Sequence, residues 1–249
     1  MIGFLKTIYR KFKKKNKFFW SVNWIKTYYF NYKKFPYAVA KKLPVFFYGS
    51  VKLSSIKGEI KIEAPIKKAM IGFGQKYELV SQSKRTAQLV LDGTIVCKGH
   101  VQFGIDYFVY VAKDAYCEFG HLSSMASNGK IICKEKIVLG KYARIGSEAQ
   151  LIDTNFHTMF NTETGEKHPM NAPIELGDYN FVSNRVTIMQ KTITPKNCTI
   201  ASNTLCNKDY TTFGENILIG GIPAKLLKEN ISRDWEGERE NLERNLIIY

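Results

Sequence analysis

The chain has 249 residues, 45% of them hydrophobic and 24% charged, which is typical of a folded protein with a real core and excludes a disordered chain. Its net charge is +15, and residues 1–50 hold twelve Lys/Arg and no Asp or Glu, so the rest carries +3 (15 − 12). No apolar run is long enough to span a bilayer, and the charges of residues 1–17 precede no continuous apolar stretch, so neither a transmembrane helix nor a secretory signal is expected.

The N-terminal segment, residues 1–57, is basic and holds nearly half of the 33 aromatic residues. We expect one or two short helices here, ending near Pro36 and Pro44. Two interpretations stay open. The aromatic residues could cover the first layer of the following domain, or the segment could attach peripherally to an anionic membrane. No reading motif accompanies the charge, so no nucleic acid partner is expected.

A period of six residues appears in the C-terminal half. It starts at Leu139, Ile145 and Leu151, and Gly140 and Gly146 follow the first two. After an interruption it resumes at Leu176, Val182, Ile188, Thr194, Ile200 and Cys206. Thr194 and Cys206 are weak apolar residues for such positions. Before residue 133 the repeat cannot be phased.

Six residues fit one strand and one tight corner of a triangular coil, and three such sides close a turn whose inward residues stack into a continuous core. A glycine suits the corner, where a side chain would be crowded. The period therefore predicts an all-β parallel solenoid, and short strand-like pieces with β-branched residues and glycine turns begin at about residue 58. An antiparallel sandwich would also give short strands and is the alternative.

A loop, residues 152–173, interrupts the repeat. Leu151 and Leu176 are 25 residues apart (176 − 151), which is not a multiple of six. The loop contains His157 and His168. Rigid scaffolds place function on loops of this kind, so His157 is the first candidate for chemistry.

Two further features complete the chain. Its five cysteines have irregular spacing, which indicates reduced thiols in a cytoplasmic protein rather than a disulfide framework. After the turn at residues 220–225, residues 229–249 have a helical pattern with pairs such as Arg239–Glu243 at i,i+4 spacing. We expect this helix to cap the exposed last coil.

The segment 173–182, its continuation to Asp209 and the closing Gly221-Ile-Pro-Ala-Lys225 resemble the hexapeptide-repeat acyltransferases, and in particular the sugar and capsular-polysaccharide O-acetyltransferases. The resemblance covers residues 58–228 and implies a left-handed parallel β-helix over this range. It also implies a homotrimer with active sites between subunits, and transfer of an acetyl group from acetyl-CoA to a sugar hydroxyl. The family's catalytic histidine falls on His157. A neutral imidazole can accept the hydroxyl's proton as the oxygen attacks the thioester. Asp153 could orient this imidazole or simply start the loop.

The family's acyl-CoA contacts fall on six positions, and lysines among them would neutralise phosphates. These are Asn184, Ser202, Asn207, Lys208, Lys225 and Lys228. The sequence departs from the common pattern at Ser183, Asn207 and Thr194-Pro195, which bears on individual contacts. No metal is expected. Other hypotheses are a non-catalytic binding scaffold and a carbonic-anhydrase-like metalloenzyme, for which the four scattered histidines are a poor fit. The expected location is the cytoplasm, with peripheral attachment to the inner face of the membrane as an option.

Overall fold

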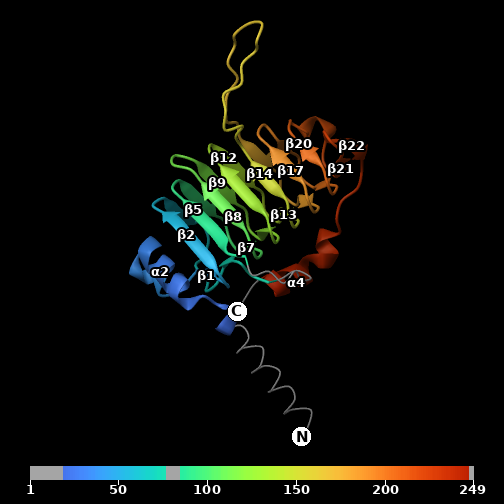
Figure 1. The fold of residues 1–249 in the computed structure, drawn as a ribbon. Helices are drawn as coiled ribbons and strands as arrows, with labels where there is room; N and C mark the ends of the chain where they lie inside the picture. The colour runs from blue at the N-terminus through green and yellow to red at the C-terminus, as the bar shows by residue number, and fades with distance from the viewer. Residues whose placement is uncertain (1–18, 77–84, 247–249) are drawn as a thin grey trace.

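The computed structural model describes residues 19–76 and 85–246. Its strands follow one another around three parallel sheets, which form the faces of a coil (Figure 1). The fold class that the sequence predicts, a left-handed parallel β-helix, is confirmed. The only antiparallel pair among the named strands is the last one.

The strands divide among three sheets. The nine-stranded sheet contains β1 (Val45–Phe47), β4 (Ile71–Phe73), β7 (Val101–Phe103), β10 (Ser123–Met125), β13 (Arg144–Ile145), β16 (Phe181–Val182), β19 (Cys198–Ile200), β21 (Ile217–Gly220) and β22 (Lys225–Lys228). The seven-stranded sheet contains β2 (Val51–Ile56), β5 (Ala87–Leu91), β8 (Phe108–Val111), β11 (Lys130–Cys133), β14 (Gln150–Ile152), β17 (Thr187–Met189) and β20 (Leu205–Cys206). The six-stranded sheet contains β3 (Glu59–Ile62), β6 (Thr94–Cys97), β9 (Tyr116–Phe119), β12 (Lys136–Leu139), β15 (Ile174–Leu176) and β18 (Ile193–Thr194).

The residues of the six-residue period all lie in the core, as predicted. The weak position, Thr194, is buried as well, and its hydroxyl donates a hydrogen bond of 2.6 Å to Oδ1 of buried Asn180. The Asn180 amide in turn donates to the carbonyl of Pro195 at 2.8 Å. A satisfied polar pair therefore replaces an aliphatic contact at this point of the core.

The corners of the coil require glycine at some positions and a left-handed backbone conformation at others. A Cβ on Gly177 would lie 2.6 Å from the carbonyl oxygen of Pro195 in the next coil, so the corner has no room for a side chain. The left-handed backbone conformation recurs every six residues, with φ between 56° and 69°, at the residues Tyr179, Arg185, Lys191, Asn197 and Asn203. Each corner thus uses one such residue to turn the chain.

The N-terminal helices are α2 (Trp24–Lys34) and α3 (Tyr37–Ala40), which end before Pro36 and Pro44 as predicted. The predicted domain boundary at residue 58 is too late. The coil already begins at β1 and β2, which pair in parallel with β4 and β5. The boundary was misplaced because the core of the first coils is aromatic, with Phe47, Phe73 and Phe103 stacked at 5.2 and 4.5 Å.

Helix α2 covers the first strand. Oδ1 of Asn31 accepts the backbone N–H of Val45 at 3.1 Å, and its amide donates to the Val45 carbonyl at 2.6 Å. The Thr27 hydroxyl accepts the N–H of Phe47 at 3.1 Å. Both polar side chains are fully buried, so they take the place of a neighbouring strand. Of the aromatic residues of this helix only Phe30 is buried with them, so the packing interpretation holds for the inner face of α2 and not for the aromatic residues as a whole.

The C-terminal helix differs from the prediction. It is α4 (Trp235–Leu246), it begins later than residue 229, and it does not cap the last coil. Trp235 and Leu242 pack instead against Leu122, Tyr142 and Tyr179, along the edge between the six- and nine-stranded sheets. The last coil ends in β22, which turns back antiparallel on β21 and so occupies the edge that the helix was expected to cover.

The five cysteines are fully buried in the coil and form no disulfide with one another. Within the described residues, 19–76 and 85–246, no helix has the length and apolar character needed to cross a membrane.

Candidate active site

The interruption of the repeat is an antiparallel hairpin, which we call the arm (residues 153–173). Bridges join Thr154 to Asn171 and Phe160 to Lys167, and the backbone N–H of His168 donates to the carbonyl of Met159 at 2.8 Å. In Figure 1 the arm stands out in yellow from the body of the coil, between β14 and β15. The candidate histidine therefore lies on a hydrogen-bonded extension rather than on an irregular loop.

His157 is exposed, and its ring has no hydrogen-bond or ion-pair partner among the described residues. The residue before it, Phe156, has a φ of 59°, which is unfavourable for a bulky side chain. The Thr154 hydroxyl fixes this turn by accepting the Phe156 N–H at 2.9 Å. The corners of the coil use the same conformation, for example at Tyr179, so the φ of Phe156 marks a sharp turn in the arm just before His157.

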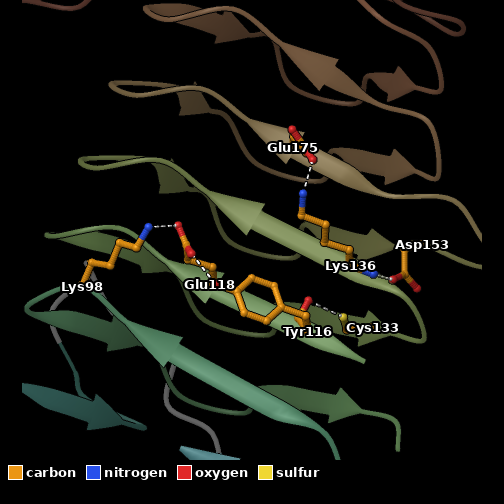
Figure 2. Close-up of polar contacts among 7 residues, drawn as sticks. All are labelled: Lys98, Tyr116, Glu118, Cys133, Lys136, Asp153 and Glu175. Atoms are coloured by element: carbon orange, nitrogen blue, oxygen red, sulfur yellow. Dashed lines mark hydrogen bonds and ion pairs between the residues drawn. The ribbon is translucent and has the colours of Figure 1, made fainter. Parts of the chain in front are cut away.

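Asp153 anchors the base of the arm. Its buried carboxylate accepts the backbone N–H groups of Lys134, Glu135 and Lys136 at 2.7, 2.8 and 2.9 Å. Figure 2 shows Asp153 beside Lys136, at the corner of the preceding coil. Of the two roles open for Asp153, the structure supports the turn residue, since its hydrogen bonds go to the backbone rather than to His157.

Asn207 and Lys208 lie at the same edge of the coil as the arm. Ile152 pairs with Met189 and Ile188 pairs with Cys206, so the chain leaves β14 and β20 at equivalent corners. Lys208 is exposed, and its ammonium lies 5.6 Å from the centroid of the Tyr210 ring. The base of the arm and the exposed ammonium of Lys208 thus lie along the same edge of the coil.

Asn184 and Ser202 lie at a different edge, between the nine- and seven-stranded sheets. Val182 pairs with Ile200, which stacks Asn184 and Ser202 in neighbouring coils. Oδ1 of Asn184 accepts the N–H of Ser147 at 3.1 Å, so this side chain also braces the preceding coil.

Lys225 and Lys228 lie on β22, opposite Gly220 and Leu218 of β21, and both are exposed. The predicted cofactor residues consequently divide between two edges and the last strand. A single chain brings Asn184 together with Ser202, and Asn207 together with Lys208, but it does not gather all six.

The remaining histidines and thiols have structural surroundings. Burial, with help from His121 and Lys67, lowers the pKa of His100 to about 4, so this imidazole is neutral near pH 7. Burial raises the pKa of Cys198 and of Cys206 to about 12, which makes both thiols poor nucleophiles. His168 is exposed on the arm. In the described parts of the chain, no three His, Cys, Asp or Glu side chains come together as metal ligands would.

Comparisons with known proteins find no matching family model and no matching curated protein. Solved structures do match, and they are hexapeptide-repeat acetyltransferases and related sugar acyltransferases, in agreement with the resemblance of the motifs. The polysialic-acid-specific acetyltransferase NeuO is 16% identical, with 76% of this chain and 78% of that chain covered and a TM-score of 0.48. The polysialic acid O-acetyltransferase OatWY is 20% identical, with 74% and 87% covered and a TM-score of 0.47.

A third structure is a hexapeptide-repeat acetyltransferase of Vibrio cholerae in complex with acetyl coenzyme A. It is 20% identical, with 50% of this chain and 64% of that chain covered and a TM-score of 0.40. Because these TM-scores lie below 0.5, the similarity does not by itself assign the reactions of these proteins to this chain.

Proposed function

We propose that the protein is an acyl-CoA-dependent O-acyltransferase that moves an acetyl group from acetyl-CoA to a hydroxyl of a sugar or surface-polysaccharide intermediate. The observation that carries the proposal is the exposed, unpartnered imidazole of His157, held by a sharp turn on an arm that leaves a rigid coil. This is the position at which the hexapeptide motifs call for a general base.

The reaction needs one proton carrier. A ring nitrogen of His157 accepts the proton of the acceptor hydroxyl while the oxygen attacks the thioester carbonyl. The tetrahedral intermediate then collapses, the carbon–sulfur bond breaks, and the imidazolium returns the proton to the departing thiolate. Atoms and charges balance without a covalent enzyme intermediate, which agrees with the raised pKa values of Cys198 and Cys206.

Acyl-CoA would contact the six residues that the motifs assign to it. Asn184 and Ser202 offer polar groups in neighbouring coils, which suits the spaced amides of pantetheine. Lys208, Lys225 and Lys228 are exposed cations that suit its phosphates. Use of acyl-CoA and five free thiols both favour the cytoplasm.

A homotrimer would complete the site. The predicted cofactor residues of one chain lie apart, and the arm exposes Phe156, Met159 and Phe160 by 50%, 56% and 60%. Exposed apolar groups on an extension favour contact with another subunit. In such an assembly the arm of one chain brings His157 to acyl-CoA bound along a neighbour.

The test measures thiol release from acetyl-CoA with a panel of sugars. We expect His157→Ala to lower the rate at least about a hundredfold, because no other group takes the proton. His168→Ala is the matched control on the same arm and should retain the rate within about threefold. Coenzyme A binding and the solution mass should be unchanged in both variants.

Wild-type activity in His157→Ala would remove the general base from the proposal. A purified wild-type protein that binds coenzyme A but releases no thiol with any sugar would favour the binding scaffold instead.

A further inference from the structure

The outer face of α2 has an unusual composition for a helix in contact with water. Its inner face buries Thr27, Phe30 and Asn31 against the first coil. Its outer face exposes Ile25 by 81% and Tyr29 by 53%. A solvated helix face normally carries charged and polar groups, so this face indicates an interaction surface.

Exposed rings form a continuous series through the half-buried Trp24, and we call this series the aromatic ridge. From Trp24 the ring centroids follow at 6.0 Å to Tyr28, 6.4 Å to Tyr32 and 6.3 Å to Tyr37. Phe19 lies 5.2 Å from Trp24 and extends the series to Trp20, which is 81% exposed. The ridge joins α2, α3 and the helical residues 19–21 before them at the N-terminal end of the coil, shown in blue in Figure 1.

Positive charge surrounds the ridge. The ammonium of Lys41 lies 5.7 Å from the Tyr37 ring centroid, and that of Lys68 lies 6.0 Å from Phe46, a ring in contact with Trp24. Lys33 and Lys42 are exposed nearby in the chain. The first acidic residue of the whole sequence is Glu59, so no carboxylate from the helices can neutralise these lysines.

We propose that the aromatic ridge docks onto an anionic lipid surface. Indole and phenol rings prefer the boundary between headgroups and acyl chains, where their apolar bodies and polar tips are both satisfied. Exposed Ile25 adds an apolar group that water disfavours, and the flanking lysines attract lipid phosphates and carboxylates. The proposal rests on α2 and α3 and does not depend on the reaction proposed for the arm.

The positive charge around the ridge argues against a second copy of this chain as its partner. A symmetric contact between two copies would press one carboxylate-free basic face against another, which is repulsive. A polysaccharide chain could also pair with lysines and rings, but the ridge follows the convex face of a helix rather than a groove. The exposed apolar side chains favour the membrane over nucleic acid, whose binding would not need Ile25.

The experiment uses the full chain and vesicles of phosphatidylcholine alone or with about 30% phosphatidylserine. We expect sedimentation with the anionic vesicles only, and weaker binding as salt rises. Ile25→Ser with Tyr29→Ser should weaken the apparent affinity about tenfold. The control Leu227→Ser removes an apolar group that is 58% exposed on β22 and should leave vesicle binding unchanged.

The charge is tested separately. Lys33→Gln with Lys42→Gln should weaken binding about tenfold or more, whereas Lys113→Gln with Lys130→Gln makes the same change of net charge on the coil and should have little effect. Equal loss in both pairs would overturn the proposal, because it would reduce the effect to total charge. Three other results would also overturn it: equal binding to neutral and anionic vesicles, retention by an anionic polysaccharide without vesicle binding, and loss of the wild-type oligomer in Ile25→Ser with Tyr29→Ser.

Discussion

Asp153 links the regular coil to the arm through a short network of backbone hydrogen bonds. Its two carboxylate oxygens accept three N–H groups from the corner of the preceding coil, within a buried site. Charge-assisted bonds of this kind are stronger than neutral ones, and losing them inside a protein also leaves donors unsatisfied. These hydrogen bonds fix the base of the arm, four residues before His157.

We expect Asp153→Asn to destabilise the protein by about 3 kcal/mol, since the amide keeps one acceptor and points an N–H₂ group at backbone donors. Urea unfolding measures the loss. Asp178→Asn is the matched control, because its half-exposed carboxylate accepts a single N–H, from Lys141 at 2.9 Å, and should cost less than about 1 kcal/mol. Equal costs for the two variants would contradict the anchoring role.

At the scale of the elements, the number of residues in each turn of the coil determines how much of the fold can be predicted from the sequence. Val182 and Ile200 are paired neighbours 18 residues apart (200 − 182), which is three repeats of six. Phe103 and Met125 are also paired neighbours but 22 apart (125 − 103), and Met125 and Ile145 are 20 apart (145 − 125). The early corners contain extra residues, so a search for a period of six fails there although the coil is the same.

The candidate site, too, could be predicted from the sequence only in part. The motifs select His157 and the cofactor positions, but they contain no information on the backbone of Phe156 or on the exposed apolar face of the arm. The helix α4 was misjudged for a related reason. Its apolar residues predict a packed face, but the partner, the row of Leu122, Tyr142 and Tyr179, is assembled only when the coils stack.

The arm is an insertion of defined length. Ile145 and Val182 are paired neighbours 37 residues apart (182 − 145), which exceeds an 18-residue coil by 19. Removing residues 154–172 deletes 19 residues and brings Asp153 and Pro173 into register with Gln190 and Lys191. Lys191 has a φ of 69°, which proline cannot adopt, so the deletion should be combined with Pro173→Asn.

We expect this deletion to fold, because the register of every coil is kept, and to lose all thiol release. Circular dichroism and thermal unfolding check the fold, with a midpoint within a few degrees of wild type. Replacing only residues 162–165 by Asn-Gly is the matched control, since a two-residue turn closes the hairpin and leaves His157 in place. Activity in the full deletion would show that the reaction does not use the arm.

At the scale of the whole molecule, the separated cofactor residues and the apolar arm predict an assembly. We expect a solution mass of three 28.5 kDa chains by sedimentation velocity. Phe156→Ser with Phe160→Ser should shift the mass toward the monomer, because the arm loses its apolar contact. Ile25→Ser with Tyr29→Ser removes a comparable exposed area from the outer face of α2 and should leave the mass unchanged. A monomeric wild-type protein would refute the trimer.

Helix α2 and strand β22 cover the two ends of the nine-stranded sheet, and such ends are where stacked parallel strands can aggregate. An open first strand and an open last strand could join head to tail, and repeated joining would give a filament without a defined end. Here Thr27 and Asn31 already hold the free backbone groups of β1, and β22 runs against the direction of the stack with a lysine at each end. The length of the particle is thus set within the chain, and a gene that lost α2 would be expected to encode a protein prone to fibre formation.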